Sequence, residues 1–349
     1  MEPTGQPINN PKIVTSLLDA MVDGREYESI VMCLPQNMDV ANEIRRSLAE
    51  IAQCRKRPCV CYAANLVTSI PYAPVSIDRN DDVPFLEMIR NIPSDVKEID
   101  IILITPGGSG ECVAHYVTQL RNRFENIGFI IPFYAMSAGT MFCLSGDEVI
   151  MSENACIGPI DPQVPTRDGR FVPAQSILAL INDIQIRGAK AIAEGKQPDW
   201  TDVQILRNLD PKEIGNAITA SQFSIDLVKS YLKDYKFRTW TTHEKRGGCV
   251  TAEEKEIRAE KIAKDLCDNS LWKTHSRGIS RELAHKVCKL KITHPESIEG
   301  LDAAIRRFWA LLYWLFERNP VCKIFISENY SLFRGTQTQQ IQRVQQVSK

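Results

Sequence analysis

The chain has 349 residues, with 42 lysine and arginine residues against 43 aspartate and glutamate residues and a formal net charge of −1. No stretch collects basic residues beside aromatic ones, so we expect no nucleic-acid partner. The eleven cysteines lack the spacing of a disulfide framework or of a complete metal site, which favours reduced thiols and no bound metal.

The chain starts with MEPTGQPINNPK, which lacks the charged and apolar regions of a secretory signal. Its longest apolar run, residues 308–316, is much shorter than the roughly 20 residues of a membrane helix. We therefore expect a cytoplasmic protein without a membrane span. The run should be buried, either inside its own helical part or against a second copy of the chain.

Short β-branched runs alternate with amphipathic runs from residue 28 to residue 151, which is typical of βα units and a largely parallel sheet. Strands are predicted at 28–34, 58–64, 98–104, 128–133 and 147–151. Helices are predicted between them, at 40–51 and 113–124. Beyond Pro173 the strand pattern ends, and helices are predicted at about 174–189, 211–236, 252–268, 280–289 and 296–318.

A glycine-rich turn, ITPGGSG at residues 104–110, follows the third predicted strand and precedes a helix. Gly107 and Gly108 can adopt positive φ there and bring backbone N–H groups close to a substrate. That arrangement suits a developing oxyanion. A plain tight turn is the alternative, whereas a phosphate loop is not expected because the Gly-Lys-Ser/Thr ending is absent.

The next strand is followed by YAMSAGT, residues 134–140, which opens a short apolar helix. Small residues flank Ser137, as a nucleophile elbow requires. The helix N-terminus would stabilise negative charge on the reacting oxygen. A serine at this position can also act only as an N-cap. Its pairing with the glycine turn favours the catalytic interpretation.

These motifs, followed by DEVIM at 147–151 and GPIDPQ at 158–163, resemble the serine dehydrogenase proteinase family, which is related to signal peptide peptidase A and the Clp proteolytic subunit. PAQSIL at 173–178 and WKTH at 272–275 extend the resemblance. It implies an α/β, Clp/crotonase-like spiral of ββα units with an appended helical region. It also implies a homo-oligomer that hydrolyses amide or peptide bonds without a cofactor. Ser137 would be the nucleophile, with backbone N–H groups of Gly107, Gly108 and Ala138 as oxyanion donors.

We accordingly expect four regions along the chain. They are a flexible N-terminus at 1–13, a catalytic core at 14–172, a helical region at 173–333 that completes the site and the oligomer contacts, and a disordered tail at 334–349. The expected partner is a peptide or protein substrate. An unfoldase or regulatory protein is a further possible partner.

The sequence leaves the general base open. Asp161 stands where the Clp subunit has its histidine, and the neighbouring prolines favour a turn-capping role for it. Signal peptide peptidases use a downstream lysine, and Lys190 lies in the corresponding window. A lysine base must be neutral, which requires burial. His275 is the competing base, because imidazole is neutral near pH 7, and Lys196 is a weaker alternative.

Two other functions stay open. A catalytically inactive relative would bind extended peptides along the edge strand beside Gly107. A crotonase-type acyl-CoA enzyme would share the oxyanion turn, but it would need no serine at position 137.

Overall fold

The computed structural model describes residues 11–243 and 247–335, which form a mixed α/β structure in two compact units. Unit 1 holds the residues up to 75, residues 83–102 and the residues from 294 onward. Unit 2 holds residues 76–82 and 103–293. The C-terminal part of the chain thus joins the N-terminal part in one unit, whereas we had expected it to continue the helical region.

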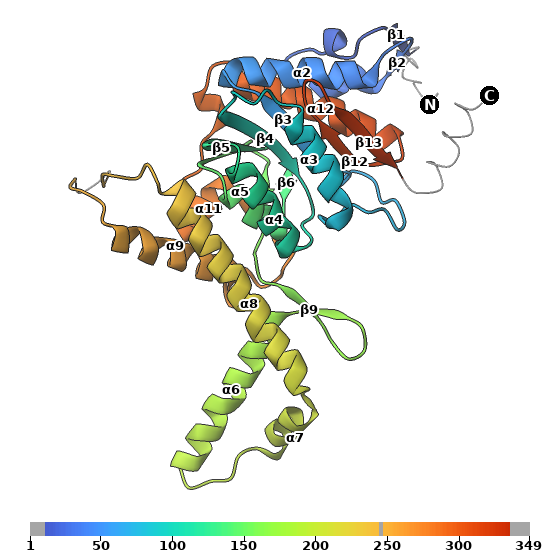
Figure 1. The fold of residues 1–349 in the computed structure, drawn as a ribbon. Helices are drawn as coiled ribbons and strands as arrows, with labels where there is room; N and C mark the ends of the chain where they lie inside the picture. Colours follow the sequence, from blue (N-terminus) through green and yellow to red (C-terminus); the bar gives the residue numbers. More distant parts are fainter. Residues whose placement is uncertain (1–10, 244–246, 336–349) are drawn as a thin grey trace, which may run out of the picture. The chain divides into compact units, whose positions relative to one another are not determined.

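Unit 1 combines a sheet with four α-helices (Figure 1). Its strands β13, β12, β3 and β4 are neighbours in that order, and β12 pairs antiparallel with both β3 and β13. A separate parallel pair joins β1 to β2. The elements are β1 Lys12–Val14, α1 Glu26–Val31, β2 Cys33–Pro35, α2 Val40–Arg55, β3 Cys59–Ala64, α3 Asp82–Arg90, β4 Glu98–Ile104, α12 Leu301–Arg318, β12 Val321–Ile326 and β13 Ser331–Gly335.

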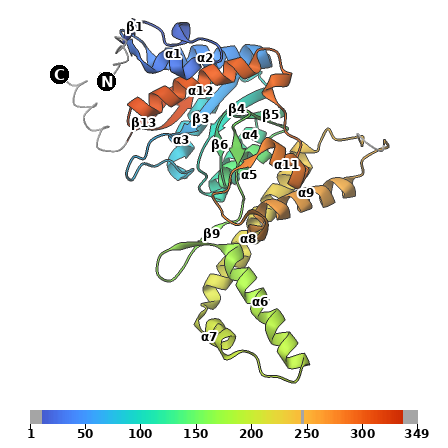
Figure 2. The ribbon, with the colours of Figure 1, turned by 180° about the vertical axis from the view of Figure 1, so that it is seen from behind.

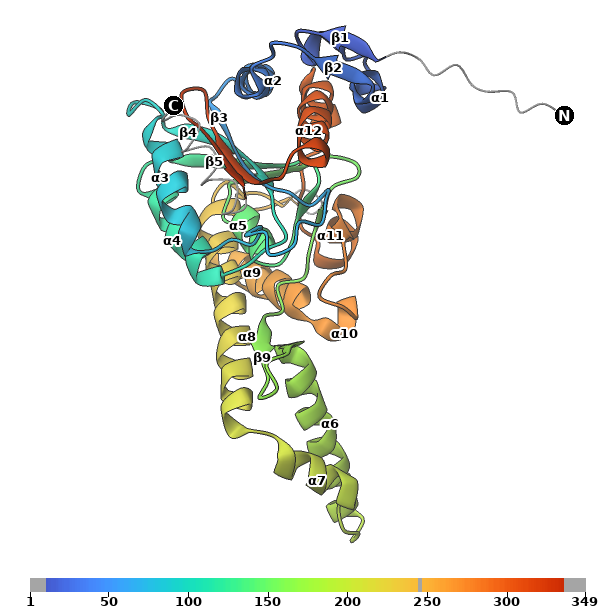
Figure 3. The ribbon, with the colours of Figure 1, turned by 90° about the vertical axis from the view of Figure 1, so that its right-hand side faces the viewer.

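The apolar run at 308–316 lies in α12 and forms the core of unit 1. Phe308, Leu312 and Phe316 are fully buried, since their spacing of four residues places them on one face of the helix. The helix packs against α1 and α2, as Figure 3 also shows. Most of the run is therefore buried within its own unit, while two of its nine residues stay partly exposed.

Unit 2 contains the two sequence motifs. Its helices and strands are α4 Gly110–Arg121, β5 Asn126–Ile131, β6 Tyr134–Ala135, α5 Ala138–Leu144, β7 Glu148–Met151, β8 Cys156–Ile157, β9 Gln163–Pro165, β10 Phe171–Pro173, α6 Ala174–Ala193, α7 Trp200–Asn208, α8 Pro211–Tyr231, α9 Ala252–Cys267, α10 Asn269–Trp272, β11 Ile279–Ser280 and α11 Arg281–Cys288. β5 pairs in parallel with β7, and β6 pairs in parallel with β8, whose other neighbour is β11.

Residues 163–220 form an arm of unit 2 (Figures 1 and 2). It consists of the β9–β10 hairpin, α6, α7 and the first half of α8. Helices α6 and α8 lie side by side, and a small apolar cluster of Val164, Ala174, Ile177 and Ala217 joins them to the hairpin. The second half of α8 packs against α5 and α9, so one helix connects the arm to the body of the unit.

Most predicted elements are confirmed, with two clear exceptions. Residues 28–34, predicted as one strand, form the end of α1 and the short strand β2. Residues 321–335, predicted to contain no strand, form the β12–β13 hairpin. Of the expected flexible ends, residues 12–14 and 331–335 are strands, while 1–10 and 336–349 lie outside the described residues.

None of the helices in the described part of the chain has the length and apolarity that a bilayer crossing demands.

Candidate active site

The glycine turn is held by hydrogen bonds on both sides of Gly107. The Gly107 N–H donates to Thr105 Oγ1 at 3.1 Å, and the Gly107 carbonyl accepts from the Ile77 N–H at 2.7 Å. The Ser109 N–H donates to the Ile77 carbonyl at 2.9 Å. Among the described residues, the N–H of Gly108 has no partner. The Gly108 N–H is therefore available as a donor, whereas the Gly107 N–H is already bonded.

Gly107 lies directly against the predicted nucleophile. A Cβ atom placed on Gly107 would be 2.7 Å from Ser137 Cβ and 3.2 Å from the Ala138 nitrogen. Its φ of 104° is also one that side chains rarely tolerate. Only glycine permits this approach, which brings the oxyanion turn and the serine turn together although about 30 residues separate them.

Ser137 itself adopts a strained backbone conformation. Its φ is 52° and its ψ is −119°, just before the first turn of α5. Such a conformation in a non-glycine residue costs about 1–3 kcal/mol and persists only where the surroundings enforce it. It is the geometry of a sharp strand-to-helix turn, and Ser137 is only half-buried there.

Gly139 and Thr140 hold this turn in place. A Cβ on Gly139 would lie 2.4 Å from Thr105 Cγ2, so α5 sits as close to the strand as glycine allows. Buried Thr140 Oγ1 lies 2.9 Å from the carbonyl oxygens of both Ala135 and Gly158 and accepts the Gly158 N–H at 2.8 Å. One hydroxyl thus ties β6, α5 and the loop after β8 together.

The same loop carries Asp161, whose carboxylate pairs with the imidazole of His275. A Cβ on Gly158 would be 3.2 Å from the Ser137 nitrogen, and the three residues from Gly158 to Asp161 can span at most about 11 Å. Asp161 is fully buried, and its Oδ1 lies 2.8 Å from His275 Nδ1. An ionised Asp161 would hold the proton on Nδ1 and leave Nε2 as an acceptor. Among the described residues, neither Ser137 Oγ nor His275 Nε2 has a hydrogen-bond partner.

Nearby cysteines do not compete as nucleophiles. Burial raises the pKa of Cys143, on α5, to about 12. Burial also raises the pKa of Cys267, at the end of α9, to about 12, an effect that the negative charge of Asp161 reinforces. Both thiols stay protonated at neutral pH, and a thiol is far less nucleophilic than a thiolate.

Lys190 does not have the environment that a lysine base requires. Its side chain is exposed in the last turn of α6, about 24 Å along the helix axis from Ala174, whose N–H bonds the carbonyl of Pro162. Lys196 is exposed too and pairs with Glu194 at 2.8 Å. The structure therefore places both lysines away from the segment that carries Asp161, and it does not supply the burial expected for Lys190.

One lysine that the sequence reasoning missed does have a suitable pKa. Burial of its amino group lowers the pKa of Lys236 to about 8. The titratable groups around it are Cys143, Asp147, Glu148 and Lys291, which lie at the C-terminal end of α5 or beyond. Ser137 is at the other end of α5, about 9 Å from Cys143 along the axis. Lys236 is thus at the wrong end of the helix to serve Ser137.

The sequence matches the model of a known protein family. The model of the ClpP-like SDH-type serine proteinase family matches residues 45–229, more than half of the chain. The chain belongs to this family. The matched region includes the glycine turn, Ser137 and Asp161, while His275 lies beyond it.

Two curated relatives are uncharacterized proteins of Methanocaldococcus jannaschii. MJ0137 is 37% identical over 110 residues, which are 32% of this chain and 36% of that protein. MJ1495 is 38% identical over 107 residues, which are 31% of this chain and 34% of that protein. The chain thus spans about a third of the length of these relatives.

Similar solved structures include two of the 1510-N membrane-bound stomatin-specific protease. One covers 62% of this chain and 74% of that chain, with a TM-score of 0.34 and 15% identity. The other, in complex with a substrate peptide, covers 61% of this chain and 67% of that chain, with a TM-score of 0.32 and 15% identity.

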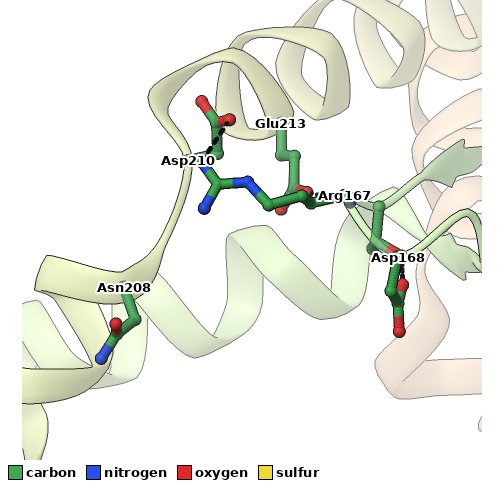
Figure 4. Close-up of a pocket in the computed structure, with 6 residues that line it drawn as sticks. Arg167, Asp168, Asn208, Asp210 and Glu213 are labelled. Atoms are coloured by element: carbon green, nitrogen blue, oxygen red, sulfur yellow. Dashed lines mark hydrogen bonds and ion pairs between the residues drawn. The ribbon is translucent and has the colours of Figure 1, made fainter.

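A surface pocket of the arm is separate from these residues (Figure 4). Arg167, in the β9–β10 loop, donates from its backbone to Glu213 at 2.5 Å and pairs with Asp210 at 3.2 Å. Thr166, Asp168 and Asn208 complete the lining. Its polar groups fasten the hairpin to the start of α8 and include none of the predicted site residues.

The close packing of Gly139 against Thr105 predicts the effect of Gly139→Ala. The added methyl group would overlap Thr105 and should destabilise the protein by about 1–3 kcal/mol. Gly188→Ala, inside α6, is the matched control, because an added Cβ there meets nothing within 4 Å and should stabilise the helix by about 0.5–1 kcal/mol. Urea denaturation measures both. A Gly139→Ala variant as stable as wild type would contradict the close packing.

Proposed function

We propose that the chain is a serine peptidase that cleaves peptide bonds through an acyl-enzyme on Ser137. His275 is the general base, Asp161 orients it, and the N–H groups of Gly108 and Ala138 stabilise the oxyanion. The observation that carries the proposal is the 2.8 Å hydrogen bond between Asp161 and His275. The loop that contains Asp161 packs against the strained Ser137 turn. A buried carboxylate behind an imidazole is the arrangement by which serine hydrolases fix the histidine tautomer.

The proposed reaction follows from these positions. Ser137 Oγ attacks the carbonyl carbon of the scissile bond while His275 Nε2 takes its proton. The carbonyl oxygen becomes an oxyanion that accepts hydrogen bonds from Gly108 and Ala138. His275 then gives the proton to the leaving amine, and water hydrolyses the acyl-enzyme by the reverse sequence of proton transfers. Ser137 and His275 must close to hydrogen-bond distance when substrate binds, as catalytic contacts often do.

The finer expectations belong to this proposal as well. They are a spiral of ββα units, a cytoplasmic location, a peptide or protein substrate, and an unfoldase or regulatory partner. Family membership supports a peptide substrate. The curated relatives are uncharacterized proteins of which the chain spans about a third, so they do not narrow the substrate further.

Covalent labelling tests the nucleophile. A fluorophosphonate probe should modify Ser137 in the wild-type protein, and mass spectrometry of the digested protein locates the adduct. Ser137→Ala should lose both labelling and hydrolysis of a casein-like substrate by at least about 1,000-fold, because the attacking oxygen is gone. Unchanged thermal stability of that variant is the control. A wild-type protein that resists the probe from pH 6 to 10 would favour the inactive, peptide-binding alternative.

Single substitutions identify the base. His275→Ala should slow hydrolysis by about 100-fold to 10,000-fold, the usual contribution of a general base. Lys190→Arg should keep wild-type activity, since its side chain is exposed on the arm. Lys236→Met is the second control, because it removes the amine with a pKa of about 8 and keeps a similar side-chain volume. Steady-state rates of the three variants show which side chain acts as the base. A His275→Ala enzyme with wild-type activity would contradict the proposed triad.

The arm supports the proposed homo-oligomer. Ile186, Ile192 and Trp200 are 60%, 66% and 73% exposed, and they lie on α6 and at the start of α7. Such large apolar side chains are costly to leave in water, and a second copy could cover them.

Light scattering at micromolar concentration should give a mass above that of one chain. The triple variant Ile186→Ser, Ile192→Ser, Trp200→Ser should shift the mass toward the monomer, because less apolar surface would then be buried between copies. A wild-type monomer would contradict the oligomer.

A further inference from the structure

The orientation of the oxyanion donor rests on a peptide group that is held from two directions. The Gly107–Gly108 peptide contributes the Gly107 carbonyl, which accepts the Ile77 N–H at 2.7 Å. The preceding peptide group, which carries the Gly107 N–H, is held separately, because this N–H donates to Thr105 Oγ1 at 3.1 Å. Thr105 is fully buried and Ile77 is 1% exposed, so neither bond competes with bulk water.

Because the peptide group is planar, these contacts fix the direction of the Gly108 N–H. In a trans peptide the C=O and the following N–H point in opposite directions. Since the Gly107 carbonyl faces Ile77, the Gly108 N–H faces away from Ile77 and is free to meet a ligand. The Ile77–Gly107 bond also polarises the peptide, which strengthens its N–H as a donor.

Thr105 is held in turn by the strand that leads to Ser137. Its N–H donates to the Tyr134 carbonyl at 2.8 Å, and its carbonyl accepts the Met136 N–H at 3.0 Å. The hydroxyl that fixes Gly107 therefore belongs to a residue that is bonded on both sides to the segment just before the nucleophile. The donor and the nucleophile share one rigid support.

We propose that Thr105 and Ile77 are positioning residues of the oxyanion hole, which fix the Gly107–Gly108 peptide so that Gly108, and not Gly107, donates to the oxyanion. The inference rests on the proposed peptidase function and deepens it. Neither residue touches the substrate. Both act through the direction of one N–H, which must be correct before the tetrahedral intermediate forms because a preorganised donor needs no rearrangement during the reaction.

Thr105→Val tests the proposal, since valine has nearly the same shape but cannot accept the Gly107 N–H. We expect kcat for peptide hydrolysis to fall about 10-fold to 100-fold. Affinity for a peptide boronate, which forms a tetrahedral adduct with the serine, should fall by a similar factor. Inhibition by the amine product, the fragment on the C-terminal side of the cleaved bond, should stay within about threefold of wild type, because that fragment brings no oxygen to the oxyanion donors.

Matched variants separate positioning from a general loss of structure. Thr105→Ser keeps the hydroxyl and should restore most of kcat. Thr118→Val, on α4, removes a hydroxyl whose one hydrogen bond within the described part of the chain goes to the Ala114 carbonyl at 2.9 Å, and it should leave all three measurements unchanged. Ile77→Pro deletes the other bond and should reproduce the Thr105→Val pattern, whereas Ile77→Val keeps the N–H and should not. This second pair carries the test if Thr105→Val does not fold.

The outcomes are distinguishable from those of the proposed function. If the wild-type protein neither reacts with the fluorophosphonate probe nor hydrolyses peptides, the peptidase proposal fails and the positioning proposal fails with it. If the wild type is active and a folded Thr105→Val enzyme matches it in kcat and boronate affinity, only the positioning proposal is overturned. Equal losses of boronate and product affinity would likewise overturn it, because they would indicate a damaged binding site.

Discussion

Close approach of backbone to backbone around Ser137 is the constraint on which the candidate site depends. Gly107, Gly139 and Gly158 each stand where an added Cβ would fall within about 3.2 Å of a neighbouring atom. This packing holds Ser137 in a strained backbone conformation with a positive φ of 52°. The strained turn is stable because three glycines and the buried Thr140 hydroxyl surround it.

This packing brings three segments of the candidate site together. The glycine turn supplies Gly108 as a donor, the serine turn supplies the hydroxyl, and the loop at Gly158 leads to Asp161. Three segments that are distant in sequence thereby converge without a metal or cofactor being required by the proposed chemistry. The arrangement also explains why α5 starts with small residues, since a larger side chain at Gly139 would displace the helix from Thr105.

Burial and hydrogen bonding are the grounds on which we propose His275 over the lysines as the general base. Lys190 is exposed, so the desolvation that a neutral lysine needs is absent. Lys236 has that desolvation but lies toward the far end of α5. His275 needs no desolvation, because its role depends on orientation, which fully buried Asp161 supplies at 2.8 Å.

Local patterns in the sequence were sufficient to predict the strands from 58 to 151, most helices of unit 2 except α7, and the turns at Gly107 and Ser137, because each depends on neighbours within a few residues. They failed for the β12–β13 hairpin, whose strand character comes from pairing with β3 more than 250 residues away. The partnership of Asp161 with His275 was hidden for the same reason, since 114 residues separate them. Only the folded chain decided which lysines are buried, which glycine keeps a free N–H and which side chains meet, because these properties depend on distances that no local pattern encodes.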